Sequence, residues 1–170
     1  MLSNFCNFAS ITVVTVLGNG KQRRLDCRNC DGDAETSRLM APVALASGRD
    51  GSLYVGDFNH IRKLGADRQQ VASILQLSMP EVPYKYYMTV SPLDAKLYIS
   101  DYQTKRILRV KTMGAVRDLA DNMEVIAGTG DQCIPGDPNR CGDNGPADQA
   151  HLFYPKGGLP YTTGIHIILK

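Results

Sequence analysis

An eight-residue pattern that occurs twice constrains the fold more than any other feature of the sequence. Asp50–Asp57 reads DGSLYVGD, and the related DAKLYISD fills Asp94–Asp101, 44 residues later. Each copy joins a turn signal, three strand-forming residues, and small residues that end in aspartate. A strand this short cannot bury its own apolar face. The repeat therefore predicts supersecondary units stacked as a solenoid, a propeller or an array.

The repeat covers four short strands per copy. Three more segments match between the copies: residues 43–46 with 87–90, 61–64 with 107–110, and 71–75 with 124–128. Four antiparallel strands in about 40–50 residues are the size of one propeller blade. We therefore predict an all-β fold with full blades at about residues 42–75 and 86–128. The side chains expected to be buried in the central strands are Leu53, Val55, Leu97 and Ile99.

A short apolar stretch lies before the first blade. Thr12–Leu17 contains only threonine, valine and leucine, and no Lys or Arg stands before it, so it does not resemble a signal peptide. It leads into Gly18-Asn19-Gly20, a turn of the kind that joins strands. We interpret this stretch as the last strand of another blade.

Two long polar loops, residues 18–40 and 129–151, share a layout. Pro42 and Pro155 follow these loops and are 113 residues apart, so we expect a third blade to begin near Tyr154.

The predicted architecture is a partial β-propeller over residues 11–157, made of about two four-stranded blades plus flanking strands. Residues 1–10 and 158–170 are left unassigned. Closed propellers contain about 4–8 blades, so we expect the chain to be a fragment of a longer protein.

Charge and hydropathy argue against a nucleic-acid interface and against a membrane helix. The formal net charge is +2, too small to favour nucleic acid, and no apolar run approaches the ~20 residues of a membrane helix. Basic residues lie in the first loop and along the third strands: Lys21, Arg23, Arg24, Arg28, Arg62, Lys63, Lys105, Arg106, Arg109 and Lys111. Aspartates are interleaved with them, so these side chains are expected to solubilise the rim of the blades.

Catalytic patterns are weak, and we predict no catalytic, cofactor-binding or metal-binding residues. His60, His151 and His166 have neither triad nor metal-ligand spacing, and His60 is expected to face solvent at a strand start. Asp57 and Asp101 recur at equivalent positions and could be paired carboxylates. Aspartates at strand ends more often accept backbone N–H bonds and shape the turn.

Residues 137–148 partly match a calcium-binding loop of the EF-hand kind. Its fifth position is Cys141, which offers no hard oxygen, and its twelfth is Asp148 where a bidentate glutamate is required. A solvated turn-rich loop is the simpler interpretation.

Several runs resemble a known family. Leu53–Asp57, preceded by residues 41–45, looks like the NHL repeat. Leu17–Arg24, followed by Cys27–Cys30, closely resembles the NHL propeller of teneurins. Further runs that carry the resemblance are residues 118–120, 124–125, 127–130, 132–133 and 140–143. The resemblance covers roughly residues 15–157 and identifies the fold as a partial NHL-type propeller.

The resemblance implies a function for the parent protein. Teneurins are single-pass cell-surface proteins with EGF-like modules, and they act as adhesion molecules and receptors in neural development through homophilic contacts and latrophilins. It places this chain at the extracellular face of the plasma membrane as a protein-recognition scaffold. Two alternatives remain: an intracellular NHL propeller that binds RNA or protein, and, less favoured, an NHL-type metal-dependent lyase.

An extracellular location would make the cysteines disulfide candidates. Cys133 and Cys141 bracket seven residues, and Cys27 and Cys30 are separated by two. Free thiols rank second. Zinc ranks last, because seven intervening residues are wide for a zinc knuckle. A redox CxxC motif would need a helix N-terminus, which the all-strand pattern does not offer. Cys6 is left over.

Overall fold

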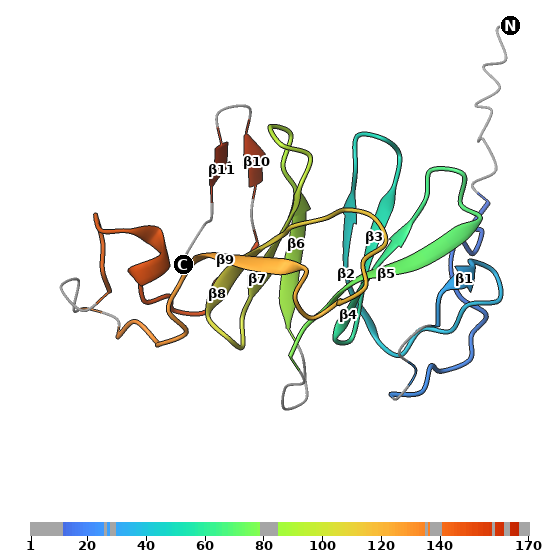
Figure 1. Ribbon diagram of the computed structural model, residues 1–170, viewed down its shortest axis with the longest axis horizontal. Coiled ribbons are helices and arrows are strands. Elements are labelled where there is room, and N and C mark those ends of the chain that lie inside the picture. Colours follow the sequence, from blue (N-terminus) through green and yellow to red (C-terminus); the bar gives the residue numbers. More distant parts are fainter. Residues whose placement is uncertain are drawn as a thin grey trace, which may run out of the picture.

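The computed structural model describes residues 12–25, 27, 30–78, 85–134, 136, 141–157, 159–161 and 164–166, the last two segments by their backbone. A first antiparallel sheet has the order β1-β5-β4-β3-β2, and a second has the order β6-β7-β8-β9 (Figure 1). The first sheet comprises β1 (Gly32–Asp33), β2 (Pro42–Ser47), β3 (Leu53–Asp57), β4 (His60–Leu64) and β5 (Gln70–Gln76). The second comprises β6 (Tyr86–Val90), β7 (Leu97–Asp101), β8 (Arg106–Val110) and β9 (Met123–Ala127). The remaining elements are the 3-10 turn η2 (Ala147–Gln149) and the hairpin of β10 (Leu159–Tyr161) and β11 (Gly164–His166).

The two sheets have the same arrangement of strands, and both contain the same irregularity in strand register. In the first sheet the pairing of β4 with β5 shifts between Ile61 and Arg62. In the second sheet the pairing of β8 with β9 shifts between Ile107 and Leu108, the matching positions of the repeat. A β-bulge increases local twist and is a designed feature of a strand. The all-β class and the partial propeller are therefore confirmed, whereas the boundaries of the propeller segment stay a prediction.

The main core lies where the sheets meet. β2 lies beside β6, and the largest apolar cluster takes side chains from both sheets, among them Ile61 and Ile74 from the first and Leu97 and Ile99 from the second. Val55, Leu97 and Ile99 are buried as the sequence predicts. Leu53 is only half-buried, because it packs at the margin of the smaller cluster formed around Leu64.

One side-chain amide joins the outer strand of the first sheet to the second. The Asn122 side chain is buried, and its Nδ2 donates to the carbonyls of Ile74 (2.6 Å) and Thr112 (2.7 Å). Its Oδ1 accepts the Thr112 N–H at 2.8 Å. The Gln76 N–H donates to the Leu119 carbonyl at 3.0 Å. These bonds satisfy backbone groups at the sheet boundary and fix the sheets relative to each other.

The N-terminal segment differs from the prediction. Thr12–Leu17 has no strand assignment, and Val13 and Val14 are 91% and 69% exposed. A strand requires a neighbour to receive its N–H and C=O groups, and no described strand pairs with this segment. The hairpin β10–β11 falls entirely within residues 158–170, to which the sequence assigned no element, and residues 1–10 lie outside the described residues.

Gly56 provides a test of the contact between the sheets. A Cβ at Gly56 would lie 2.5 Å from Cε2 and 2.8 Å from Cζ of the buried Tyr86 ring. Gly56→Ala should therefore lower the free energy of unfolding by about 1–3 kcal/mol, measured by urea denaturation. Gly114→Ala is the control, because nothing lies within 4 Å of its added Cβ. Equal stability of the two variants would contradict this packing.

Candidate recognition loops

The first loop (residues 18–40) and the second loop (residues 129–151) share one backbone design. The equivalent backbone hydrogen bonds are Gly18 N to Ala34 O and Asn19 N to Ser37 O at the first loop, and Gly128 N to Ala147 O and Thr129 N to Ala150 O at the second. Isolated parallel bridges also match, Gln22 with Leu39 and Gln132 with Leu152. These bonds extend to Arg23 and Cys133, whose N–H groups donate to the carbonyls of Leu39 and Leu152. The shared layout inferred from the sequence is a shared structure.

Each loop contains a disulfide. Cys27 is bonded to Cys30, with Cα atoms 5.8 Å apart, and Cys133 to Cys141, with Cα atoms 5.0 Å apart. Cys6 lies outside the described residues. Disulfides form and persist in oxidising environments and are rare in the cytosol. The two bonds therefore favour an extracellular location.

A buried ion pair attaches the start of the first loop to β3. Arg23 Nε lies 3.0 Å from Asp57 Oδ2, and both side chains are almost fully buried. Asp57 Oδ1 accepts the backbone N–H groups of Met40 (2.6 Å) and Ala41 (2.8 Å). The interpretation of Asp57 as an acceptor of backbone N–H bonds is confirmed. Sequence reasoning missed its arginine partner, which lies 34 residues away and was assigned to a solvated basic loop.

A second buried arginine holds the end of the same loop. Arg62 on β4 donates through Nη1 to the Arg38 carbonyl (2.9 Å) and through Nη2 to the Cys30 carbonyl. Its Nη2 also lies 3.6 Å from Asp31 Oδ1, which completes an ion pair. Asp31 in turn accepts a hydrogen bond from Ser73 Oγ at 2.7 Å. Burial lowers the pKa of Arg62 below its usual range. The prediction that Arg23 and Arg62 solubilise the blade rim is wrong, because both anchor the first loop from inside.

His60 is also placed differently from the expectation. It is only 4% exposed, and its Nδ1 lies 3.0 Å from Asn59 Oδ1. His60 lies two residues before Arg62 on β4, so both side chains point to the same face of the strand, the face that the loop covers. Burial, followed by the positive charge of Arg23, lowers the pKa of His60 to about 4. The imidazole is therefore neutral at physiological pH.

The rim of the second sheet carries exposed charge pairs instead. Arg109 Nε lies 2.6 Å from Glu124 Oε1, and Arg109 Nη1 lies 3.8 Å from Asp94 Oδ2. The hydrogen bond that Arg109 donates to Glu124 raises the pKa of Arg109 and lowers the pKa of Glu124. Asp101, the equivalent of Asp57, accepts the N–H groups of Gln103 (3.0 Å) and Thr104 (3.1 Å). For the second sheet, the structure agrees with the prediction that charged side chains lie on the blade rim and that Asp101 shapes the turn.

The two loops do not form one surface. They lie at opposite ends of the long axis of the molecule, the first loop at the end that includes β1 and the second at the end that includes η2 (Figure 1). Each exposes a large apolar side chain, Leu25 in the first (54% exposed) and Ile134 in the second (55%). The second loop also contains four aspartates against one arginine. Among the described residues, no group of His, Cys, Asp or Glu could hold a metal ion.

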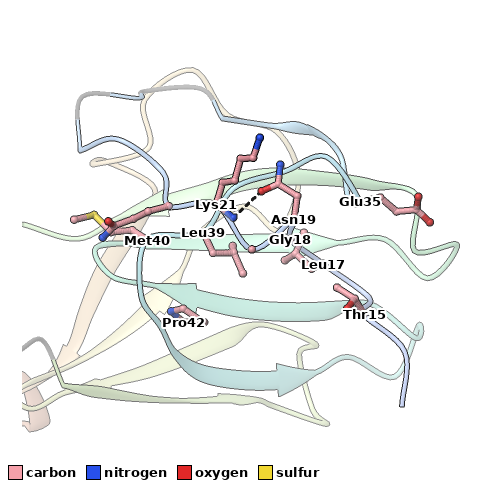
Figure 2. Close-up of a pocket in the computed structure, with 11 residues that line it drawn as sticks. Thr15, Leu17, Gly18, Asn19, Lys21, Glu35, Leu39, Met40 and Pro42 are labelled. Carbon is pink, nitrogen blue, oxygen red and sulfur yellow. Dashed lines mark hydrogen bonds between the residues drawn. The ribbon is translucent and has the colours of Figure 1, made fainter. Parts of the chain in front are cut away.

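A depression of about 870 Å³ lies between the N-terminal segment and the first loop. Its apolar wall includes Leu17, Leu39 and Pro42. Figure 2 shows Asn19 and Lys21 along one margin, where the Lys21 N–H donates to Asn19 Oδ1 at 3.0 Å. Most of its lining residues belong to the first loop, but neither cysteine of the loop's disulfide is among them.

Comparison with known proteins decides the family. The family model of the teneurin NHL domain matches residues 10–168. The chain belongs to the teneurin NHL domain family. Human Teneurin-1 is 48% identical over 145 residues and Drosophila melanogaster Teneurin-m is 45% identical over 145 residues; each match covers 85% of this chain. The chain spans only 5% of the length of either relative.

A solved structure supports the fold alone. It is a Bacteroides thetaiotaomicron protein of unknown function that aligns with a TM-score of 0.53 at 21% sequence identity. The alignment covers 73% of this chain and 29% of that protein. In the teneurin NHL chain, the part that the structure describes contains no helix with the length and apolarity to cross a membrane.

The buried ion pair should dominate the stability of the first loop. Asp57→Asn removes the charge that Arg23 requires, and leaving a buried charge unpaired costs about 3–5 kcal/mol. Thermal or urea unfolding should show a loss of this size. Asp121→Asn is the matched control, since Asp121 forms an exposed pair with Lys111 at 3.4 Å and such pairs contribute at most about 1 kcal/mol. Similar losses in both variants would contradict the assignment.

The depressed pKa of His60 sets a pH dependence with a definite sign. Below pH 6.5 the unfolded chain binds a proton at His60, and the folded chain does so only near pH 4. Stability should therefore fall as pH drops through this window, by about 3 kcal/mol in total. His60→Gln should remove this component from urea unfolding curves recorded between pH 7 and 4, and His151→Gln is the control. An unchanged slope in His60→Gln would refute it.

Proposed function

We propose that this chain is an extracellular protein-recognition module of a teneurin-like cell-surface protein and acts in neuronal cell–cell contact and signalling. The observation that supports it best is the pair of disulfide-containing loops, each attached to a propeller sheet and each presenting an exposed apolar side chain. Loops positioned by a rigid scaffold are common sites of recognition. Family membership supports the same proposal.

The mechanism is presentation of a fixed shape. Arg23 and Arg62 hold the first loop against the sheet, and a disulfide closes each loop. A loop that is ordered before binding loses less conformational entropy on association, which increases affinity. The partner is a protein: a second copy of the chain or, by family resemblance, a latrophilin-like receptor. The absence of a catalytic centre stays a prediction.

The positions and pairing of the basic residues favour a protein partner over RNA. Arg23 and Arg62 are buried, while Arg109 and Lys111 pair with carboxylates on the rim. Binding to nucleic acid depends on basic side chains that are free to neutralise phosphates. These four residues are already engaged within the fold.

The loops can be tested by binding. Beads that carry the secreted chain should bind cells that display the same chain or a latrophilin-family receptor. Leu25→Asp or Ile134→Asp should weaken that binding about tenfold or more, equivalent to at least ~1.4 kcal/mol, because each places a charge in an apolar contact. The readout is bead retention by flow cytometry at graded surface density.

Leu93→Asp is the matched control, because Leu93 is 60% exposed on the turn between β6 and β7, outside both loops. Mass spectrometry of each secreted variant should show both disulfides intact. Undiminished binding by both loop variants, or an equal loss in Leu93→Asp, would overturn the role of the loops.

A further inference from the structure

The sequence contains three pairs of adjacent basic residues: Arg23-Arg24, Arg62-Lys63 and Lys105-Arg106. Such pairs mark the peptide bonds that one class of secretory-pathway endoproteases hydrolyses, because acidic subsites of these enzymes bind two neighbouring cationic side chains. The protease has to take the substrate into its cleft as an extended segment without strand partners. The three pairs therefore differ as substrates according to the structure around them.

Two of the pairs lie in or beside central strands. Arg62 and Lys63 belong to β4, which is paired with β3 on one side and β5 on the other. Arg106 begins β8, which is paired with both β7 and β9. A strand with two neighbours cannot enter a protease cleft unless its sheet opens. Of the three pairs, only Arg23-Arg24 lies in a loop.

The stretch around the loop pair is exposed apart from one side chain. Lys21, Gln22, Arg24 and Leu25 are all exposed, whereas Arg23 is buried, at 3% exposure. The Arg24–Leu25 peptide bond is therefore at the surface. The basic side chain that a protease would bind just before Arg24 is inside the fold.

The contacts of Arg23 close this site in two ways. Its Nε lies 3.0 Å from Asp57 Oδ2, and its Nη2 donates to the Asp57 carbonyl at 3.5 Å. Its Nη1 donates to the Arg24 carbonyl at 3.2 Å, and the Cys27 N–H donates to the same carbonyl at 3.3 Å. A protease has to direct that carbonyl at its own oxyanion-stabilising donors. Release of Arg23 from Asp57 therefore frees a basic side chain and removes one donor from the carbonyl to be attacked.

We propose that the Arg24–Leu25 bond is a conditional cleavage site for an endoprotease specific for paired basic residues, and that the ion pair between Arg23 and Asp57 keeps it closed. Hydrolysis adds water across this bond, the hydroxyl to the Arg24 carbonyl carbon and the hydrogen to the Leu25 nitrogen. Cleavage then occurs only while the first loop is detached from its sheet. The inference requires passage through the secretory pathway and is independent of the proposed recognition function.

A cut at this bond has a large consequence because no disulfide of the described residues spans it. Both disulfides join cysteines that follow Leu25. The part before the cut would be held by packing and hydrogen bonds, among them the backbone bonds donated by Gly18, Asn19 and Arg23. The polypeptide before Leu25 would be released once these bonds break.

Digestion with a kexin-type protease, which cleaves after paired basic residues, tests the site in the secreted chain. A synthetic peptide of residues 19–26 is the unfolded reference and should be cut after Arg24. Mass spectrometry should show the folded chain cut at the same bond at least about tenfold more slowly, because cleavage follows the population of the open loop. Equal rates, or a peptide that resists the protease, would overturn the proposal.

Substitution of Asp57 tests the closing contact. Asp57→Asn should speed cleavage after Arg24 at least about tenfold, because the buried arginine loses its charged partner. Asp121→Asn is the matched control and should leave the rate unchanged, since it removes only the exposed pair with Lys111. Arg24→Gln in the Asp57→Asn chain should abolish the cut. Resistance of Asp57→Asn, or equal acceleration in Asp121→Asn, would show that the ion pair does not close the site.

The Lys105-Arg106 pair distinguishes opening of the loop from loss of the fold. A cut after Arg106 requires the second sheet to open, so the cut after Arg24 should come first in Asp57→Asn. If Asp57→Asn is not secreted, the native chain in graded urea below its unfolding midpoint supplies the same comparison. Simultaneous cleavage at both pairs would show that the first loop does not open by itself and would overturn the proposal.

Discussion

The structure depends on the contact between its two sheets, because neither sheet can bury an apolar face alone. Strands of about five residues offer one or two core side chains each, and only the sum across β2–β5 and β6–β9 makes a continuous core. Tyr86 occupies the space that Gly56 leaves, and Asn122 ties backbone carbonyls on both sides of the boundary. Every further feature, including the two loops, rests on sheets fixed in this way.

The two loops, which are attached to these sheets, are ordered by different interactions. Buried charge holds the first loop: Arg23 reaches from the loop to Asp57 on β3, and Arg62 reaches from β4 to the Arg38 carbonyl in the loop. Buried charged groups cost desolvation energy and need full pairing, so such an arrangement specifies one conformation of the loop. The second loop has Cys133 at the position of Arg23, and this cysteine is bonded to Cys141 within the same loop instead of pairing with a strand. The two loops therefore share one backbone arrangement but are stabilised by different interactions.

Much of this could be predicted from the sequence, for physical reasons. The repeat of Asp50–Asp57 predicted the paired sheets because alternating burial forces the same residue types into the same places in each blade. The resemblance to an extracellular family, together with the spacing of the cysteines within each loop, indicated the residues that form disulfides. The burial of His60 and Arg62 was not foreseen, because it depends on a loop that folds over β4 from about thirty residues away, and no local pattern reports that contact. Thr12–Leu17 has strand composition, yet composition cannot supply the neighbouring strand that makes it one.

The exchange of Arg23 for Cys133 at one backbone position has a consequence under reducing conditions. A reducing agent would open the disulfides of both loops. The first loop would still be attached to its sheet by the Arg23–Asp57 ion pair and by the hydrogen bond from Arg62 to the Arg38 carbonyl. The end of the molecule that carries the first loop should therefore keep more of its order after reduction than the end that carries the second.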